Sequence, residues 1–220
     1  MEARYRKDYD GEFVIANSHW TQAKNEQKRE WIPNAIENHH ISGRAAIIGS
    51  RTDKEIFDYT RLQKHRGGLL GKNRLQIYGS GDLWKDLKFD FHVTNDPNQL
   101  GQIQKAGYSD ENIVFTSARY CLLNPGKFYL IPYFQTLDQL VQAVYLAAFD
   151  GHEEIFLLGY NNDTPAGQST WFEQLNAVFT AYSETSFILI GAESNMPDVW
   201  RNNSNVSCMD YRSWVSYCDI

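Results

Sequence analysis

The sequence contains no apolar run long enough to cross a bilayer, which takes about 20 consecutive residues. The opening segment, MEARYRKDYDGEF, lacks the apolar centre of a secretory signal peptide. The cysteines are few, namely Cys121, Cys208 and Cys218, and none of them forms a C-x-x-C pair. These absences predict a cytoplasmic protein without membrane contact, whose reduced thiols build neither a disulfide framework nor a zinc site.

The common phosphate-binding motifs are also missing. No G-x-G-x-x-G follows a strand-like segment, and GLLGK at residues 68–72 has the wrong length for a P-loop. The adjacent His39 and His40 have no carboxylate or thiol partner at a useful spacing, so we expect surface histidines and no metal site. A ligand site must therefore be sought from the order of the predicted elements.

The composition is that of an ordinary globular protein. The chain has 220 residues, of which 42% are hydrophobic, 22% charged and 14% aromatic. This length is enough for one sizeable core and short for two, so we expect a single domain over residues 1–220.

Charge is distributed unevenly along the chain. Residues 1–74 carry 14 Lys and Arg against 10 Asp and Glu, whereas residues 75–220 carry 7 against 17. The densest basic segment, residues 61–74, has five cations, three glycines and no acid. Such a segment either binds phosphates or forms a solvated loop, and the sequence leaves both interpretations open. The candidate contacts to a phosphate backbone are Lys64, Arg66 and Lys72.

The chain is organised around residues 136–163. Apolar residues recur at helical spacing from Leu137 to Ala148, which predicts a helix with one buried stripe. Thr136 and Gln139 match a capping box, and Gly151 is typical of a helix end. The run IFLLG at residues 155–159 then predicts a strand buried on both faces.

Strand-like and helical segments alternate over the rest of the chain. This rhythm predicts a Rossmann-like α/β fold, with a mostly parallel central sheet and helices on both faces. Residues 1–44 differ: we expect a hairpin that turns at Asp10 and Gly11, followed by an irregular arm over residues 17–42 that lies on the sheet. The predicted strands cover residues 45–50, 75–81, 89–96, 112–116, 128–131, 155–159, 186–191 and 206–209, and the further helices 170–182 and 211–217.

The predicted strands end in small, amide or acidic residues. In open parallel sheets ligands bind just beyond the carboxyl ends of the strands, so these positions are the candidate site. Carboxylates there serve as a base, hold a metal, or cap a turn or helix. We expect His92 to be a buried strand residue and His152 to cap the preceding helix. The candidate catalytic residues are Asp82, Asp96 and Asp163.

Three segments, AAIIGSRTDKEIFDYTRL, LQIYGSGDLWKDLKFDFHVTND and VYLAAFDGHEEIFLLGYNND, together resemble a Rossmann-like superfamily. It contains bacterial sialyltransferases and pterin diphosphokinase-like proteins, and small proteins of T4-like phages are similar over the whole chain. The resemblance implies that strand-end turns hold the nucleotide of a nucleotide sugar. It places the nucleotide-binding residues at Gly49, Ser50, Arg51, Gly79, Ser80, Gly81, Asn95 and Asn161.

The chain departs from the superfamily pattern at several positions, one of which is Asn161, where the aspartate of G-x-D is usual. Gly49-Ser50-Arg51 stands where G-N-G is usual and Gly79-Ser80-Gly81 where C-N-x is usual, so two asparagines are replaced. The segment FYLIPY at residues 128–133 lacks the histidine that acts in the sialyltransferases. Sialyl transfer itself is therefore not expected.

Three functions remain open. The first is a glycosyltransferase that uses a UDP- or CMP-linked sugar and adds a sugar such as glucose or arabinose to hydroxymethylated cytosine in phage DNA. The second is a nucleotide-dependent diphosphokinase or other phosphotransferase, which would need magnesium. The third is a phage protein without catalytic activity that binds a nucleotide or a host factor.

Overall fold

The structure is a computed structural model that describes most of the chain. The described residues are 1, 3–6, 14–21, 26–33, 43–49, 57–65, 75–132, 137–160, 170–192, 194 and 196–220. Among them, no helix is long and apolar enough to span a membrane.

The described residues form an eight-stranded sheet in which every strand runs parallel to its neighbours. The order across the sheet is β10-β9-β8-β3-β4-β5-β6-β7. The predicted Rossmann-like α/β fold is confirmed. The strands are β3 (Arg44–Ile48), β4 (Leu75–Gly79), β5 (Phe91–Val93), β6 (Ile113–Thr116), β7 (Tyr129–Leu130), β8 (Glu154–Leu158), β9 (Ser186–Ile190) and β10 (Val206–Met209).

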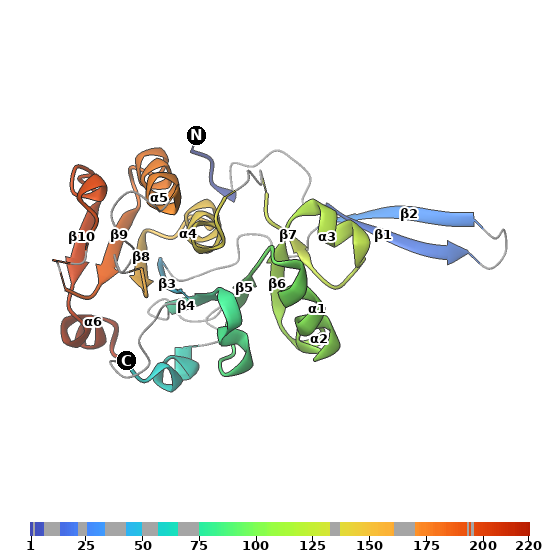
Figure 1. Cartoon of the computed structure of the whole chain (residues 1–220), viewed down its shortest axis with the longest axis horizontal. Helices are drawn as coiled ribbons and strands as arrows, with labels where there is room; N and C mark the ends of the chain where they lie inside the picture. Colours follow the sequence, from blue (N-terminus) through green and yellow to red (C-terminus); the bar gives the residue numbers. More distant parts are fainter. Residues whose placement is uncertain are drawn as a thin grey trace.

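Helices cover the sheet on both faces. Figure 1 shows α4 and α5 on one side of the strands and α6 on the other. The α-helices are α1 (Pro97–Lys105), α2 (Tyr108–Glu111), α3 (Ala118–Leu123), α4 (Gln139–Asp150), α5 (Thr170–Ala181) and α6 (Tyr211–Cys218). The 3-10 helices are η2 (Tyr59–His65), η4 (Gly81–Lys85) and η6 (Asp198–Trp200).

The strands are apolar on both faces because a hydrophobic layer covers each side. Along β3, Ala45 and Ile47 pack into the cluster beneath α4 and α5, whereas Ala46 and Ile48 pack into the cluster on the opposite face. All four side chains are at most 1% exposed. This double burial explains the continuous apolar run, since a strand with one solvated face would alternate.

Helix α4 is buried more completely than its sequence predicts. Every residue from Leu140 to Asp150 is buried, so the prediction of a helix with only one buried stripe is wrong. The helix lies between the sheet, α5 and the segment at residues 3–6. Its N-cap is Asp138, whose carboxylate accepts a hydrogen bond from the Leu140 N–H at 2.9 Å, while Thr136 lies outside the described residues. Gly151 ends the helix with a φ of 90°, as predicted.

The N-terminal region contains a separate antiparallel hairpin. Strand β1 (Val14–Thr21) pairs with β2 (Glu26–Pro33) in a continuous register that ends with Thr21 opposite Glu26. The hairpin extends away from the main sheet (Figure 1). The prediction of an irregular arm lying on the sheet is therefore wrong for residues 17–21 and 26–33, because cross-strand pairing supplies the order that hydrophobic spacing does not show. The predicted turn at Asp10 and Gly11 lies outside the described residues.

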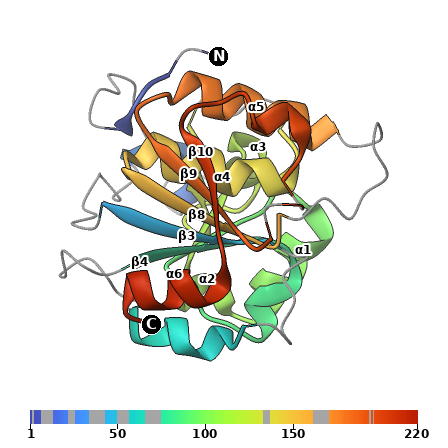
Figure 2. The ribbon, with the colours of Figure 1, turned by 90° about the vertical axis from the view of Figure 1, so that its left-hand side faces the viewer.

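The short segment at residues 3–6 packs against the layer formed by α4 and α5 (Figure 2). The rings of Tyr5 and Tyr182 meet edge to face, 5.2 Å apart, and the Tyr182 hydroxyl donates to the Arg4 carbonyl at 2.8 Å. Arg6 reaches Asp150 at the end of α4, with 2.6 Å between nitrogen and oxygen. The beginning of the described chain is thus tied to its centre.

Candidate functional site

The strand order creates a topological switch point between β3 and β8. From β3 the chain builds the sheet outward through β4 to β7, and it then returns to the other side of β3 as β8. In open α/β sheets ligands bind beyond the carboxyl ends of the strands at such a point. We call the carboxyl ends of β8, β3, β4 and β5 the rim.

Five predicted nucleotide-binding residues lie on this rim, and Ser80 and Gly81, which follow β4 directly, are two of them. Gly49 follows β3, Gly79 ends β4 and is paired with Ile48, and Asn95 comes shortly after β5. The Ser80 N–H donates to the Ile48 carbonyl at 3.2 Å, which holds the turns after β3 and β4 together. The structure thus brings residues from three separate segments to one edge.

Packing leaves little space for a side chain at two glycines of the rim, Gly49 and Gly79. A Cβ atom on Gly79 would lie 2.4 Å from the ring of Phe89. A Cβ atom on Gly49 would lie 3.2 Å from the Leu158 and Gly159 carbonyl oxygens and 3.3 Å from the Tyr160 ring. The Cβ direction of Gly49 is therefore filled by the end of β8.

A network of polar side chains connects the ends of β4 and β5 to the first turn of α4. The Gln99 amide nitrogen donates to Asp82 Oδ1 at 3.4 Å, and the Gln99 amide oxygen accepts from Gln139 Nε2 at 3.0 Å and pairs with His92 Nε2 at 3.4 Å. Gln139 also donates to the Thr94 hydroxyl at 3.0 Å. We call Asp82, His92, Thr94, Gln99 and Gln139 the rim network.

His92 is a fully buried member of the rim network. It is 0% exposed, and burial lowers the pKa of its imidazole to about 4, so the ring is neutral near pH 7. The Gln99 amide oxygen accepts hydrogen bonds, so the proton sits on Nε2. Nδ1 then has a lone pair, and no partner for it exists in the described part of the chain. The Ser80 hydroxyl is buried and equally without a described partner.

The candidate carboxylates differ in what they do. Asp96 is the N-cap of α1 and accepts a hydrogen bond from the Asn98 N–H at 2.8 Å. The side chain of Asp82, in contrast, is 71% exposed, and Lys85 approaches it to 3.3 Å. Asp82 is thus an open carboxylate supported by a buried amide, whereas Asp96 is engaged in capping.

Asn95 is engaged in local structure. Its side-chain oxygen accepts hydrogen bonds from the Thr116 hydroxyl at 3.1 Å and from the Ser117 N–H at 3.0 Å. It therefore joins the turn after β5 to the end of β6.

Gly81 opens η4 with a φ of 69°, a left-handed conformation that favours glycine.

Several predicted residues lie outside the part of the chain that the structure describes. Residues 50–56, which follow β3, and residues 161–169, which follow β8, are outside the described residues. The residues concerned are Ser50, Arg51, Arg66, Lys72, Asn161 and Asp163.

Lys64, from the predicted phosphate-binding set, lies in η2 and contacts the end of the described chain. Its ammonium donates to the Asp219 carbonyl at 3.0 Å, and Arg61 donates to the Ile220 carbonyl at 2.6 Å. The two cations thus hold the residues that follow α6. The structure does not place Lys64 in the rim network.

A second buried polar cluster lies where α4 leads into β8. The Tyr78 hydroxyl donates to Asp150 Oδ2 at 2.6 Å and lies 3.0 Å from His152 Nε2. Arg6 pairs with the other Asp150 oxygen. Burial raises the pKa of Asp150 to about 6, although the Arg6 guanidinium and the Tyr78 hydrogen bond lower it. The side chain of His152 therefore pairs with Tyr78, where the sequence predicted a helix cap.

The sequence interpretation missed Thr94, Gln99 and Gln139. Gln99 is in the first turn of α1, after an Asp-Pro helix start, and Gln139 was assigned to a capping box. The available signal was the position of two glutamines in the first turns of neighbouring helices. Within the described residues, no group of three or more His, Cys, Asp or Glu is arranged to hold a metal ion.

Comparison of the chain with protein-family models, with curated proteins and with solved structures finds no match.

Proposed function

We propose that the protein is a glycosyltransferase that uses a nucleotide sugar and binds this donor along the rim. The observation that carries the proposal is the placement of an exposed carboxylate, Asp82, beside the switch point and against the amide of Gln99. Glycosyl transfer needs a base beside the bound nucleotide, and Asp82 lies just beyond the carboxyl end of β4, where ligands of open α/β sheets bind.

In the proposed reaction the Asp82 carboxylate accepts the proton of an acceptor hydroxyl. The hydroxyl oxygen forms a bond to the anomeric carbon while the bond from that carbon to the phosphate oxygen breaks, so the nucleotide leaves with the electron pair. Gln99 orients Asp82, and Lys85 lies 3.3 Å from the same carboxylate oxygen.

For the acceptor we propose hydroxymethylated cytosine in DNA, as the resemblance to phage proteins suggests. The net charge of −6 opposes broad attraction to DNA, so the contact would be local. The basic segment at residues 61–74 supports it by composition, although Lys64 is bound to the Asp219 carbonyl.

The test pairs Asp82→Asn with Asp96→Asn. We expect Asp82→Asn to lower the turnover of a nucleotide sugar by about 100-fold or more while the donor still raises the melting temperature. Asp96→Asn should leave turnover unchanged, because asparagine caps a helix as well as aspartate does.

Donor consumption and melting temperature are measured with separate UDP- and CMP-linked sugars, with and without DNA that carries hydroxymethylcytosine. Full turnover by Asp82→Asn would contradict the role of this carboxylate. Stabilisation by ATP and magnesium, with no response to any sugar donor, would favour a phosphotransferase, and binding without turnover would favour a protein without catalytic activity.

A further inference from the structure

A cavity of about 360 Å³ lies between the η4 turn and the α1–α2 connection. One wall is the stretch from Trp84 to Lys88, and the other is formed by residues 106–108 with Glu111 and Asn112. Its volume is at the lower end of the roughly 300–1,000 Å³ typical of small-molecule sites. The cavity therefore suits one small ligand.

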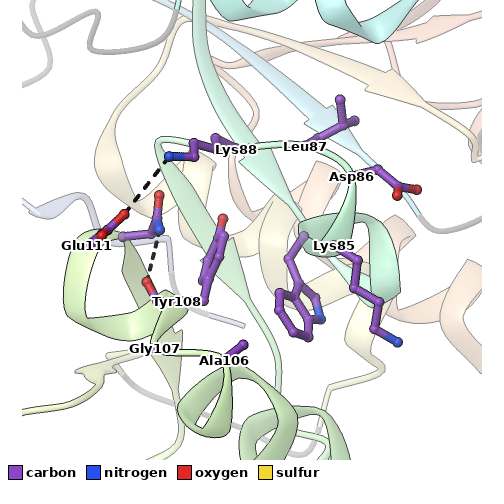
Figure 3. Close-up of a pocket in the computed structure, with 10 residues that line it drawn as sticks. Lys85, Asp86, Leu87, Lys88, Ala106, Gly107, Tyr108 and Glu111 are labelled. Atoms are coloured by element: carbon purple, nitrogen blue, oxygen red, sulfur yellow. Dashed lines mark hydrogen bonds and ion pairs between the residues drawn. The ribbon is translucent and has the colours of Figure 1, made fainter.

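Aromatic side chains from both walls meet at this cavity. The rings of Trp84 and Tyr108 are 5.4 Å apart and meet edge to face. Tyr108 stands between the Lys88–Glu111 ion pair and the turn that carries Lys85 (Figure 3). Two rings from different segments form a surface on which a flat ring can pack.

The charged groups of the cavity favour an uncharged ligand. Lys85 and Lys88 are balanced by Asp86 and Glu111, so the lining has no net charge. Trp84 is 9% exposed, so a ligand in the cavity would contact only part of its indole ring.

The cavity is physically connected to the rim network. Tyr108, on its wall, also contacts the ring of His92 edge to face at 6.2 Å, and Lys85, on the opposite wall, pairs with Asp82. A ligand that shifts Tyr108 or Lys85 would therefore act directly on two members of the rim network.

We propose that this cavity binds an uncharged planar heteroaromatic ring of the nucleobase type, held against Trp84 and Tyr108. This site is distinct from the proposed donor site, since none of its lining residues belongs to the rim network. A nucleoside fits its volume, and the balanced charge of the lining gives little preference for a phosphate.

The experiment observes Trp84 directly. Protein labelled with 5-fluorotryptophan is titrated with cytidine, adenosine or ribose, and ¹⁹F NMR follows the indole resonances. The resonance that is missing in Trp84→Phe identifies Trp84. We expect this resonance to shift in a saturable way with the nucleosides and to remain unmoved with ribose.

Two further variants locate the binding site. Ala106→Leu adds volume to the cavity wall at an exposed position, and we expect it to weaken nucleoside binding by about ten-fold or more. Leu123→Ala, on α3 at a side chain that is 64% exposed, is the matched control and should bind as the unmodified protein does.

The inference is overturned if no nucleoside moves the Trp84 resonance at millimolar concentration, or if Ala106→Leu binds nucleosides unchanged. A short single-stranded oligonucleotide distinguishes a free nucleoside from a base presented by a nucleic acid, and a saturable Trp84 shift with either ligand supports the inference. Because the test contains no sugar donor, its outcome is independent of whether the protein transfers a sugar.

Discussion

Single side chains decide what the rim can do, and residues of one type have different roles there. Asp82 is open to solvent, Asp96 caps α1 and Asp138 caps α4. The sequence predicted acidic residues at the ends of strands, but it could not tell a carboxylate that caps a helix from one that is open to solvent. The distinction depends on whether a free N–H lies two residues further on in a helix, which only the folded backbone shows.

His92 should make the protein sensitive to acid. Its pKa of about 4 in the folded state is below the value of about 6.5 of an unfolded histidine, so the unfolded chain binds the proton more readily. The stabilisation from neutral His92 is complete above pH 6.5 and is lost as the pH falls from 6.5 towards 4. Between pH 7 and pH 5 we expect the free energy of unfolding to fall by about 2 kcal/mol more than in His92→Gln.

The measurement is urea denaturation of both proteins at the two pH values. The two proteins are compared because Asp150, whose pKa is raised to about 6, also contributes to the pH dependence of stability. Its contribution changes with pH in the opposite direction to that of His92. Because Asp150 is present in both proteins, its contribution cancels in the difference between them. Equal pH dependence of the two proteins would show that His92 does not titrate as its burial requires.

At the scale of elements, the sequence predicted most of the sheet. The strand at residues 155–159 and the helix up to Gly151 were found because burial on both faces leaves a continuous apolar run and because a left-handed glycine ends a helix. The hairpin of β1 and β2 was missed because its order comes from one strand pairing with another. Contacts between segments, such as Phe89 against Gly79, are likewise absent from local patterns.

The junction between β4 and the segment before β5 should not tolerate a side chain at Gly79. Gly79→Ala would place a Cβ atom 2.4 Å from the Phe89 ring, and overpacking of this kind costs about 1–3 kcal/mol. In the Gly79→Ala background, Phe89→Leu should recover part of this loss, since the smaller side chain frees the space.

Gly101 provides the control for this prediction. It lies inside α1, and a Cβ atom there would meet nothing within 4 Å. Gly101→Ala should therefore raise the free energy of unfolding by about 0.5–1 kcal/mol through helix propensity. Thermal and urea denaturation check both variants. If Gly79→Ala were as stable as the unmodified protein, Phe89 would not limit that position.

At the scale of the whole molecule, a buried ion pair joins the beginning of the described chain to its centre. The side chains of Arg6 and Asp150 are 3% and 2% exposed. Removing one partner of such a pair costs about 3–5 kcal/mol, because the other charge stays buried. We therefore expect Arg6→Met to be strongly destabilised and Arg6→Met with Asp150→Asn to recover much of the loss.

The loss in Arg6→Met should also depend on pH. Without the guanidinium, the pKa of Asp150 rises further above the value of about 3.9 in the unfolded chain. The Asp150 carboxyl releases its proton more readily in the unfolded chain than in the folded protein. The free energy of unfolding therefore falls as the pH rises through the pKa that Asp150 has in the folded state. Urea denaturation at pH 5.5 and pH 8 should show the larger loss at pH 8, and an equal loss at both would rule out this origin.

The position of β3 between β4 and β8 has a consequence for biosynthesis. Strand β8 ends at Leu158 of 220 residues, so most of the polypeptide must leave the ribosome before β3 has a neighbour on each side. Until then the nascent chain exposes the apolar side chains of β3 and the edge that pairs with β8. The amide and carbonyl groups of that edge have no partners during this time. A translational pause before residue 154 should accordingly promote aggregation or chaperone capture, whereas a pause after the synthesis and release of β8 should not.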